Sequence, residues 1–508
     1  MEELIALINL FKTMPGNVKA RLFRDGQDKL KVMYDFMENI YSGNLLSDEE
    51  ASKHYFNSPP TNSRYYSLKK RLRDKLLAWI LNAENPYIKY EELEYASITL
   101  HRLGAQVAVL NTIGIYLAAN KINISILKIA SKFNLPEFGE KAARNIRDFY
   151  AYRELNLVKY NYYKTLSEQL TNENKIECLA GELYSSFMVA FYSNNKGRYV
   201  LGNIVTKYIS QIEELLLLNN SNRIKQYISK INILALIAEK EFNLALNKVS
   251  KDLIDLEKAP FKQNLLKNEL LLNQMVCYLN LKQFDEGKKV AEGLVFMHTT
   301  PNEINLKNAE LSFLLSLHGQ HYNEAATIWF EVSKKGLLQN INPTEREKWE
   351  TYKIYLYFLH LTGEISIDFS STLFKGFRQA KFFNTVPHLN KDKSGMNVSI
   401  VAIEFILHLT QGKFDKITDK YEGLIKYSYR YLRDTESLRS YSFIRLLLLI
   451  PNCAYNWKTI SERSELMLEN LNAQPNIESS IKLGAEIIPY DVLWKLINKH
   501  TPDRKLKF

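Results

Sequence analysis

The chain has little of what turn-rich, disulfide-bonded or membrane-spanning proteins are built from. Its 508 residues include only 19 Gly and 13 Pro, and all-β folds need more of both for their turns. No apolar run reaches the roughly 20 residues that cross a bilayer. The nearest candidate, 105–119, is interrupted by polar side chains. These shortages predict a soluble, all-α protein with no membrane partner.

Cysteine is also scarce. Cys178, Cys277 and Cys453 are odd in number and widely separated, so no pair has the short spacing of a zinc knuckle or a redox motif. We expect reduced, buried thiols, which indicate a reducing compartment. The segment Met1-Glu2-Glu3 is acidic and lacks the basic start and apolar core of a signal peptide. These features predict a cytoplasmic protein.

Sequence motifs of catalysis are missing. The chain contains no glycine-rich phosphate loop, nucleophile elbow or metalloprotease helix motif, and its nine His are scattered. We therefore expect no cofactor, no metal site and no catalytic residue, and a protein that is not an enzyme. An enzyme with an unrecognised helical active site remains an alternative, because active sites assemble from distant residues.

What the chain does contain is helical periodicity. Residues 65–80 carry apolar side chains at spacings of three and four, which is the pattern of one stripe on a single helix. The stripe consists of Tyr65, Leu68, Leu72, Leu76 and Ile80. Upstream, Ser47-Asp48-Glu49-Glu50 has the residue types of a helix start. The sequence thus predicts an N-terminal module of several helices.

The predicted helix at 64–75 is strongly basic. It carries six Lys or Arg against the single acid Asp74, in a chain whose 67 Lys and Arg exceed 56 Asp and Glu. Lys69, Lys70 and Arg73 lie opposite the apolar stripe, and Arg64 precedes them. Phosphate contact by this helix is one interpretation, since the order of elements resembles a helix-turn-helix domain. A solvated amphipathic helix is the other, because the connection is longer than the usual turn.

A faint repeat occupies the middle of the chain. Each copy follows an apolar helix and a polar turn, and places an aromatic residue three positions before a small or apolar one. The copies begin at Phe242, Phe284, Tyr322 and Phe414, and are followed by Ala245, Gly287, Ala325 and the larger Ile417. Where two antiparallel helices meet at a tight turn, an aromatic can fill the hairpin and a small residue lets the backbones approach. This pattern predicts stacked helical hairpins.

The best copy resembles the tetratricopeptide repeat, a helical hairpin of about 34 residues. Tyr278, Phe284, Gly287 and Ala291 match the types of that signature. The resemblance covers about 235–335 and a separate copy at 400–425, although the aromatic positions lie 42 and 38 residues apart. It implies a curved scaffold that binds peptides or proteins rather than a catalyst. A generic α-solenoid is the alternative.

The register of these hairpins predicts which side chains would line the concave side of the array. One unit contributes Glu269, Leu272, Val276 and Leu279, and the next contributes Lys307, Glu310, Leu314 and Leu317. The set is mainly apolar, so it favours a hydrophobic partner helix or an internal filling helix over a charged peptide tail.

We therefore expect an all-α chain of three parts. These are an N-terminal helical module with the basic helix (1–95), a helical hairpin array of tetratricopeptide-like α-solenoid type (96–390), and C-terminal hairpins with a cap (391–508). The expected function is a non-enzymatic scaffold or adaptor that binds a protein or peptide in the groove of the array. The alternative is a nucleic-acid-binding regulator that uses Arg64, Lys69, Lys70 and Arg73, with the array as a sensor.

Overall fold

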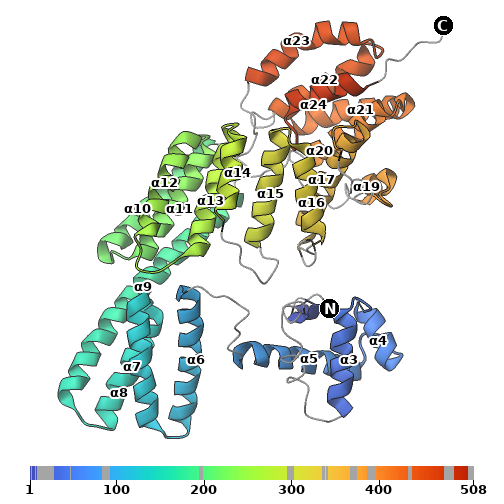
Figure 1. The fold of residues 1–508 in the computed structure, drawn as a ribbon. Helices are drawn as coiled ribbons and strands as arrows, with labels where there is room; N and C mark the ends of the chain where they lie inside the picture. Colours follow the sequence, from blue (N-terminus) through green and yellow to red (C-terminus); the bar gives the residue numbers. More distant parts are fainter. Residues whose placement is uncertain are drawn as a thin grey trace. The chain divides into compact units, whose positions relative to one another are not determined.

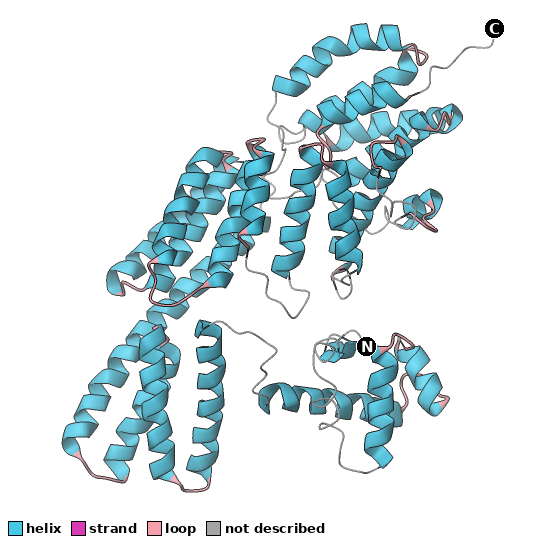
Figure 2. Ribbon diagram, in the orientation of Figure 1, coloured by secondary structure: helices cyan, strands magenta, loops and turns pink. Residues whose placement is uncertain are grey.

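The chain folds into α-helices joined by short turns. The structure is a computed structural model that describes residues 1, 3–5, 7–8, 28–45, 47–82, 92–193, 198–294, 303–334, 338, 341–366, 374–385, 396–432, 438–473 and 486–501. Within these ranges every regular element is a helix and none is a strand (Figure 2). The predicted all-α class is confirmed.

Two compact units divide the chain. The first contains the described residues of 1–174 and 260–263, and the second those of 175–259, 264–294 and 303–508. The dividing point falls inside one long helix, α9, which contributes to both units. The boundary expected at 95–96 lies inside a helix as well, and the one expected at 390–391 lies outside the described residues.

After helical residues near the N-terminus, three helices of the first unit surround a small core that also contains Leu4 and Ile8. They are α3 (Asp28–Tyr41), α4 (Asp48–Phe56) and α5 (Ser63–Asn82). The predicted helix start is present as a capping box, in which Ser47 and Glu50 each bind the other's backbone N–H. The predicted apolar stripe of α5 packs against Phe36, with Tyr65, Leu68, Leu72 and Leu76 all buried. The side chain of Ile80 lies outside the described residues.

The rest of the first unit is a bundle of antiparallel helices. It contains α6 (Glu92–Thr112), α7 (Tyr116–Phe133), α8 (Pro136–Tyr152) and the first part of α9 (Leu157–Ser193). α7 packs between α6 and α8, and Tyr160 and Tyr163 of α9 pack on Phe149 and Tyr150 of α8.

In the second unit the helices from α10 to α17 and from α20 to α24 each pack on the next one along the chain, and α17 packs on α20 (Figure 1). After α9 come α10 (Arg198–Leu218), α11 (Asn222–Ala238), α12 (Phe242–Glu257), α13 (Asn264–Asn280), α14 (Phe284–Glu292), α15 (Glu303–His318), α16 (Tyr322–Lys334), α17 (Pro343–Leu361), α19 (Gln379–Thr385), α20 (Met396–Thr410), α21 (Phe414–Tyr431), α22 (Leu438–Asn452), α23 (Trp457–Ala473) and α24 (Tyr490–His500). First helices of successive hairpins also pack together, α13 on α15 and α20 on α22. This sequential packing is that of an α-solenoid.

One turn geometry recurs at the four repeat copies. Phe242, Phe284, Tyr322 and Phe414 each begin the second helix of a hairpin, as predicted. Two residues earlier the backbone is left-handed, at Lys240, Lys282, Gln320 and Gly412, with φ of 64°, 60°, 62° and 66°. The next N–H then bonds a carbonyl five residues back, for example Gln283 to Tyr278 at 2.9 Å. This is a Schellman-type helix end, and it reverses the chain in about three residues.

The residue three positions after each aromatic is buried, and it is small in three of the four copies. Ala245, Ala325 and Ile417 are fully buried. A Cβ built on Gly287 would lie 2.7 Å from Leu315 Cδ2 and 3.2 Å from Tyr278 Cβ. Only glycine fits there without displacing a neighbour, so the predicted role of this position is confirmed.

A buried ion pair helps to attach α24, the last of the described helices. The Arg439 guanidinium of α22 donates to both carboxylate oxygens of Glu486, at 2.7 and 2.8 Å, and to the carbonyl of Leu471. Glu486 in turn accepts the N–H of Tyr490 at the start of α24. The Glu486 carbonyl lies 3.1 Å from Nε2 of His318 on α15. Residues far apart in sequence are thereby joined by one polar network.

Candidate interaction surfaces

The residues expected to line the groove divide into exposed and buried sets. On α13, Leu272 and Val276 are half-buried, and Glu269 is 40% exposed in an ion pair with Lys230. Leu279, at the end of the same helix, is only 2% exposed. One face of α13 thus remains partly open to a partner, and Leu279 belongs to the core.

The expected groove residues of α15 are mostly buried. Leu314 and Leu317 are 3% and 0% exposed, because α15 packs against α13, α14 and α16. Lys307 is 40% exposed, and its Nζ lies 2.8 Å from a carboxylate oxygen of Glu310. Of this set, only Lys307 presents surface to solvent.

Glu310 is a fully buried charge held by three partners. Nζ of Lys307 and of Lys348 each lie 2.8 Å from its carboxylate, and the Tyr352 hydroxyl donates to it at 2.8 Å. Burial opposes ionisation, but the two ammonium groups outweigh it and lower the pKa of Glu310 to about 2. This cluster joins α15 to α17, and its role is structural.

The basic helix α5 is partly neutralised within its own module. Nζ of Lys69 lies 2.7 Å from Asp48, which also accepts the Tyr65 hydroxyl at 2.5 Å and the Met1 amino group at 3.0 Å. Burial opposes the charge on Asp48, yet these hydrogen bonds lower its pKa to about 2. The ion pair binds α5 to the start of α4, so Lys69 is tied into the module.

Arg73 is paired too. Its Nε lies 2.8 Å from a carboxylate oxygen of Glu3, and its Nη1 lies 3.6 Å from Asp74. Arg64, Lys70 and Arg71 are exposed, and no ion pair engages them within the described part of the chain. The exposed cations without an ion pair in this part of the structure are therefore Arg64 and Lys70, which belong to the predicted set, and Arg71, which does not.

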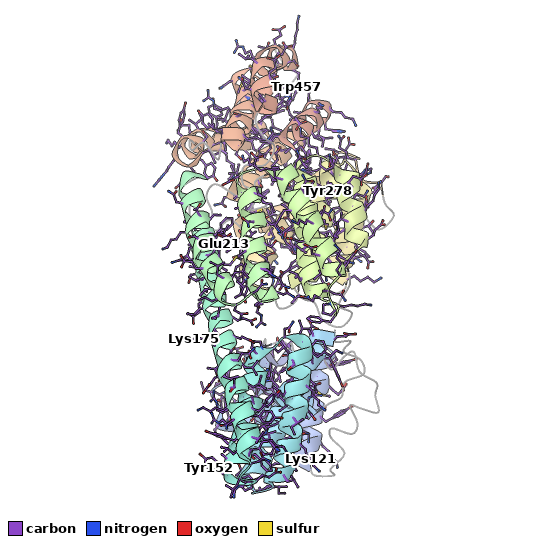
Figure 3. The ribbon with its side chains drawn as sticks, turned by 90° about the vertical axis from the view of Figure 1, so that its left-hand side faces the viewer. Lys121, Tyr152, Lys175, Glu213, Tyr278 and Trp457 are labelled. Carbon is purple, nitrogen blue, oxygen red and sulfur yellow. The ribbon has the colours of Figure 1, made fainter. Side chains whose placement is uncertain are left out.

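A second surface, unforeseen in the sequence, lies at one end of the α6–α9 bundle. We call it the tip surface and define it by Ile113, Leu117, Tyr152, Leu155, Leu157 and Val158, which are 58–81% exposed. They come from the α6–α7 turn and the α8–α9 turn, which antiparallel packing places at the same end. Figure 3 shows Tyr152 at that end, together with Lys121 of α7. The Arg153 guanidinium lies 3.8 Å from the Tyr116 ring centroid and bridges the two turns.

The sequence does hold a signal for this surface. Leu155-Asn156-Leu157-Val158 places three apolar side chains in and just after a turn, where polar residues are the rule. In a helical protein, however, apolar residues such as these are also typical of buried core positions. Only the position of the turn at the end of the bundle shows that these side chains face solvent.

No group of three or more His, Cys, Asp or Glu able to hold a metal ion occurs among the described residues. No helix in the same ranges is both long and apolar enough to cross a membrane. Comparisons with protein-family models, with curated proteins and with solved structures found no match.

Proposed function

We propose that this protein is a non-enzymatic interaction scaffold of the cytoplasm, whose hairpin array is of the tetratricopeptide-like type and binds a protein partner. The observation that carries the proposal is the recurrence of one hairpin turn. At four places a residue with left-handed backbone conformation is followed by an aromatic residue that begins a helix and by a buried contact residue. Repeats of this kind form extended surfaces from side chains of successive units, which suits binding rather than catalysis.

The open face of α13 is the proposed binding surface of the array. Leu272 and Val276 supply half-buried apolar area, and Glu269 and Lys307 supply charge at its edges. An amphipathic helix of the partner fits such a surface, because apolar anchors at helical spacing can pack between the exposed side chains. Burial of Leu279, Leu314 and Leu317 restricts the site to this one face.

A pull-down of the full chain from its native cell, with and without nuclease, tests the proposal. We expect a stoichiometric protein partner that survives nuclease and is lost with Leu272→Gln. Leu244→Gln on α12, where the side chain is 54% exposed, is the matched control and should retain the partner. Melting curves of both variants establish that the fold is intact. A partner retained equally by both variants would overturn the binding face.

The nuclease arm also tests the alternative of nucleic-acid binding through α5. Recovery that collapses with nuclease would favour that alternative. Charge reversal at Arg64, Lys70 and Arg71 should then abolish binding to DNA or RNA. These three are the better targets, since reversal of Lys69 or Arg73 would break the ion pairs with Asp48 and Glu3 and weaken the module itself.

A further inference from the structure

The tip surface is unusual because its apolar side chains are almost fully exposed. Leu155 and Val158 are 80% and 81% exposed, and Leu157 is 70% exposed. Single exposed apolar residues are common on protein surfaces, but a contiguous group marks an interaction site. Exposure of these apolar side chains to water is unfavourable in the isolated chain. Docking of an apolar partner surface would remove this area from water and so lower the free energy.

The backbone at the tip is also strained. Leu155 has a φ of +51°, a conformation that costs a residue other than glycine roughly 1–2 kcal/mol. The corresponding position of the α6–α7 turn is Gly114, with a φ of +82°, which bears no such cost. A strained leucine with its side chain in water stabilises neither the turn nor the core. The exposed Leu155 side chain is therefore available for contact with a partner.

The positive charge around the tip surface indicates which kind of partner it would bind. The two turns and the helix starts that follow them expose Lys121, Arg153, Lys159 and Lys164, against the single exposed acid Glu154. Glu154 lies 4.0 Å from Lys159, so the surroundings of the apolar group are positive overall. A second copy of the same surface would bring like charges together, which opposes self-association. An acidic partner is complementary.

The bridging arginine favours a protein over other anionic surfaces. The Arg153 guanidinium carbon lies over the Tyr116 ring, 3.8 Å from its centroid, and this contact restrains the side chain beside the two turns. Among the described residues no hydrogen bond or ion pair engages that guanidinium, so its N–H edges are open. A guanidinium fixed in this way matches the planar carboxylate of Asp or Glu with two parallel hydrogen bonds.

We propose that the tip surface is a docking site for a protein segment that carries an apolar patch bordered by Asp and Glu. Leu155, Leu157 and Val158 fill the apolar contact, and Arg153 pairs with an acidic side chain at its edge. This site lies in the first unit and goes beyond the α13 face proposed above. The scaffold would then hold two partners, or two segments of one partner, on separate units.

Site-specific photo-crosslinking in the native cell tests this proposal. A photoreactive phenylalanine analogue replaces Leu157 in the full chain, and in a control it replaces Leu217 of α10, which is 88% exposed. We expect Leu157 to crosslink to a protein segment rich in Asp, Glu and apolar residues, identified by mass spectrometry, and Leu217 not to do so. Arg153→Glu in the Leu157 probe should lower the crosslink yield about fivefold or more. Lys426→Glu, at an 81% exposed side chain of α21, should leave it unchanged.

Several results would overturn the proposal. Crosslinks to lipid would show a membrane contact, and crosslinks to a second copy of the chain would show self-association. Crosslinks to a segment without an acidic excess, or a yield at Leu157 no higher than at Leu217, would refute the stated chemistry. Leu272→Gln serves as a separate arm, because loss of the α13 partner with an intact tip crosslink distinguishes this site from the array.

Discussion

At the scale of single residues, Gly287 shows how closely the two helices of a hairpin approach. A methyl group there would meet Leu315 and Tyr278 at 2.7 and 3.2 Å. We expect Gly287→Ala to lower the free energy of unfolding by about 1–3 kcal/mol, as overpacked cores do. Gly423→Ala on α21 is the matched control, because no atom lies within 4 Å of its added Cβ. That variant should gain roughly 0.5–1 kcal/mol. Urea denaturation measures both, and equal effects would contradict the tight contact.

Glu347 on α17 is a buried carboxyl group whose Oε1 has no hydrogen-bond partner among the described residues. Burial raises its pKa from the ordinary 4.5 to about 7. Between those two pH values the folded state binds the proton more strongly than the unfolded state, so this group makes stability fall as pH rises from about 4.5 to 7.

We therefore expect Glu347→Gln to stabilise the protein at pH 8, on the order of 1–3 kcal/mol, and to have little effect near pH 4.5. Urea denaturation of the wild type and the variant at both pH values measures this difference. Glu350→Gln, one turn further along α17, controls for the loss of one charge. A gain for Glu347→Gln that is the same at both pH values would refute the pKa as its cause.

At the scale of secondary-structure elements, the recurrent turn explains why the repeat is faint in sequence. Its left-handed position is Lys, Lys, Gln and Gly in the four copies, so no single residue type marks it. The same geometry precedes α7 and α8, where Gly114 and Asn134 have positive φ and Ala119 and Gly139 are the buried contact residues. This turn geometry thus also occurs outside residues 235–335 and 400–425, where the sequence resembles the repeat.

Arg439 contributes a buried ion pair to the attachment of α24, beside the apolar packing of Leu493 and Ile497. Arg439→Met would leave the Glu486 carboxylate buried without its charged partner, and this should cost about 3–5 kcal/mol. We expect faster amide hydrogen exchange in α24 and a lower melting temperature. The double variant Arg439→Met with Glu486→Met should recover much of the loss, because no buried charge remains.

A surface ion pair of the same helix provides the contrast. Lys499 contacts Glu364 at 2.7 Å with 64% of its side chain exposed, so Lys499→Met should cost under about 1 kcal/mol. A loss for Arg439→Met no larger than this would show that the buried network does not hold α24.

At the scale of the whole molecule, the hydrophobic clusters of the described residues each lie within one compact unit. We expect calorimetry to show at least two unfolding transitions. Gly287→Ala should lower only the transition of the second unit. Gly139→Ala, whose added Cβ would lie 3.2 Å from Leu170 Cδ1, should lower only that of the first. A single transition shifted by both variants would show that α9 couples the units into one cooperative system.

Much of the fold follows from short stretches of sequence. The 3.6-residue period of apolar side chains predicts the α5 stripe, and an aromatic residue after a polar turn predicts the starts of α12, α14, α16 and α21. Both signals arise from contacts within a few residues or across one hairpin, so a local pattern is sufficient to encode them.

The solvent exposure of individual side chains cannot be predicted from short stretches of sequence in the same way. The apolar period of α15 shows which side chains share a face, but Leu314 and Leu317 are buried because helices on several sides cover them. Lys69 forms an ion pair with Asp48, 21 positions away in sequence, and Arg73 forms one with Glu3, 70 positions away. Both cations are therefore less available to a partner. Leu155 and Val158 remain in water because no other part of the described chain packs on the end of their bundle. Helix formation depends on neighbours along the chain, whereas exposure depends on which distant segments meet, and that is decided only when the helices pack.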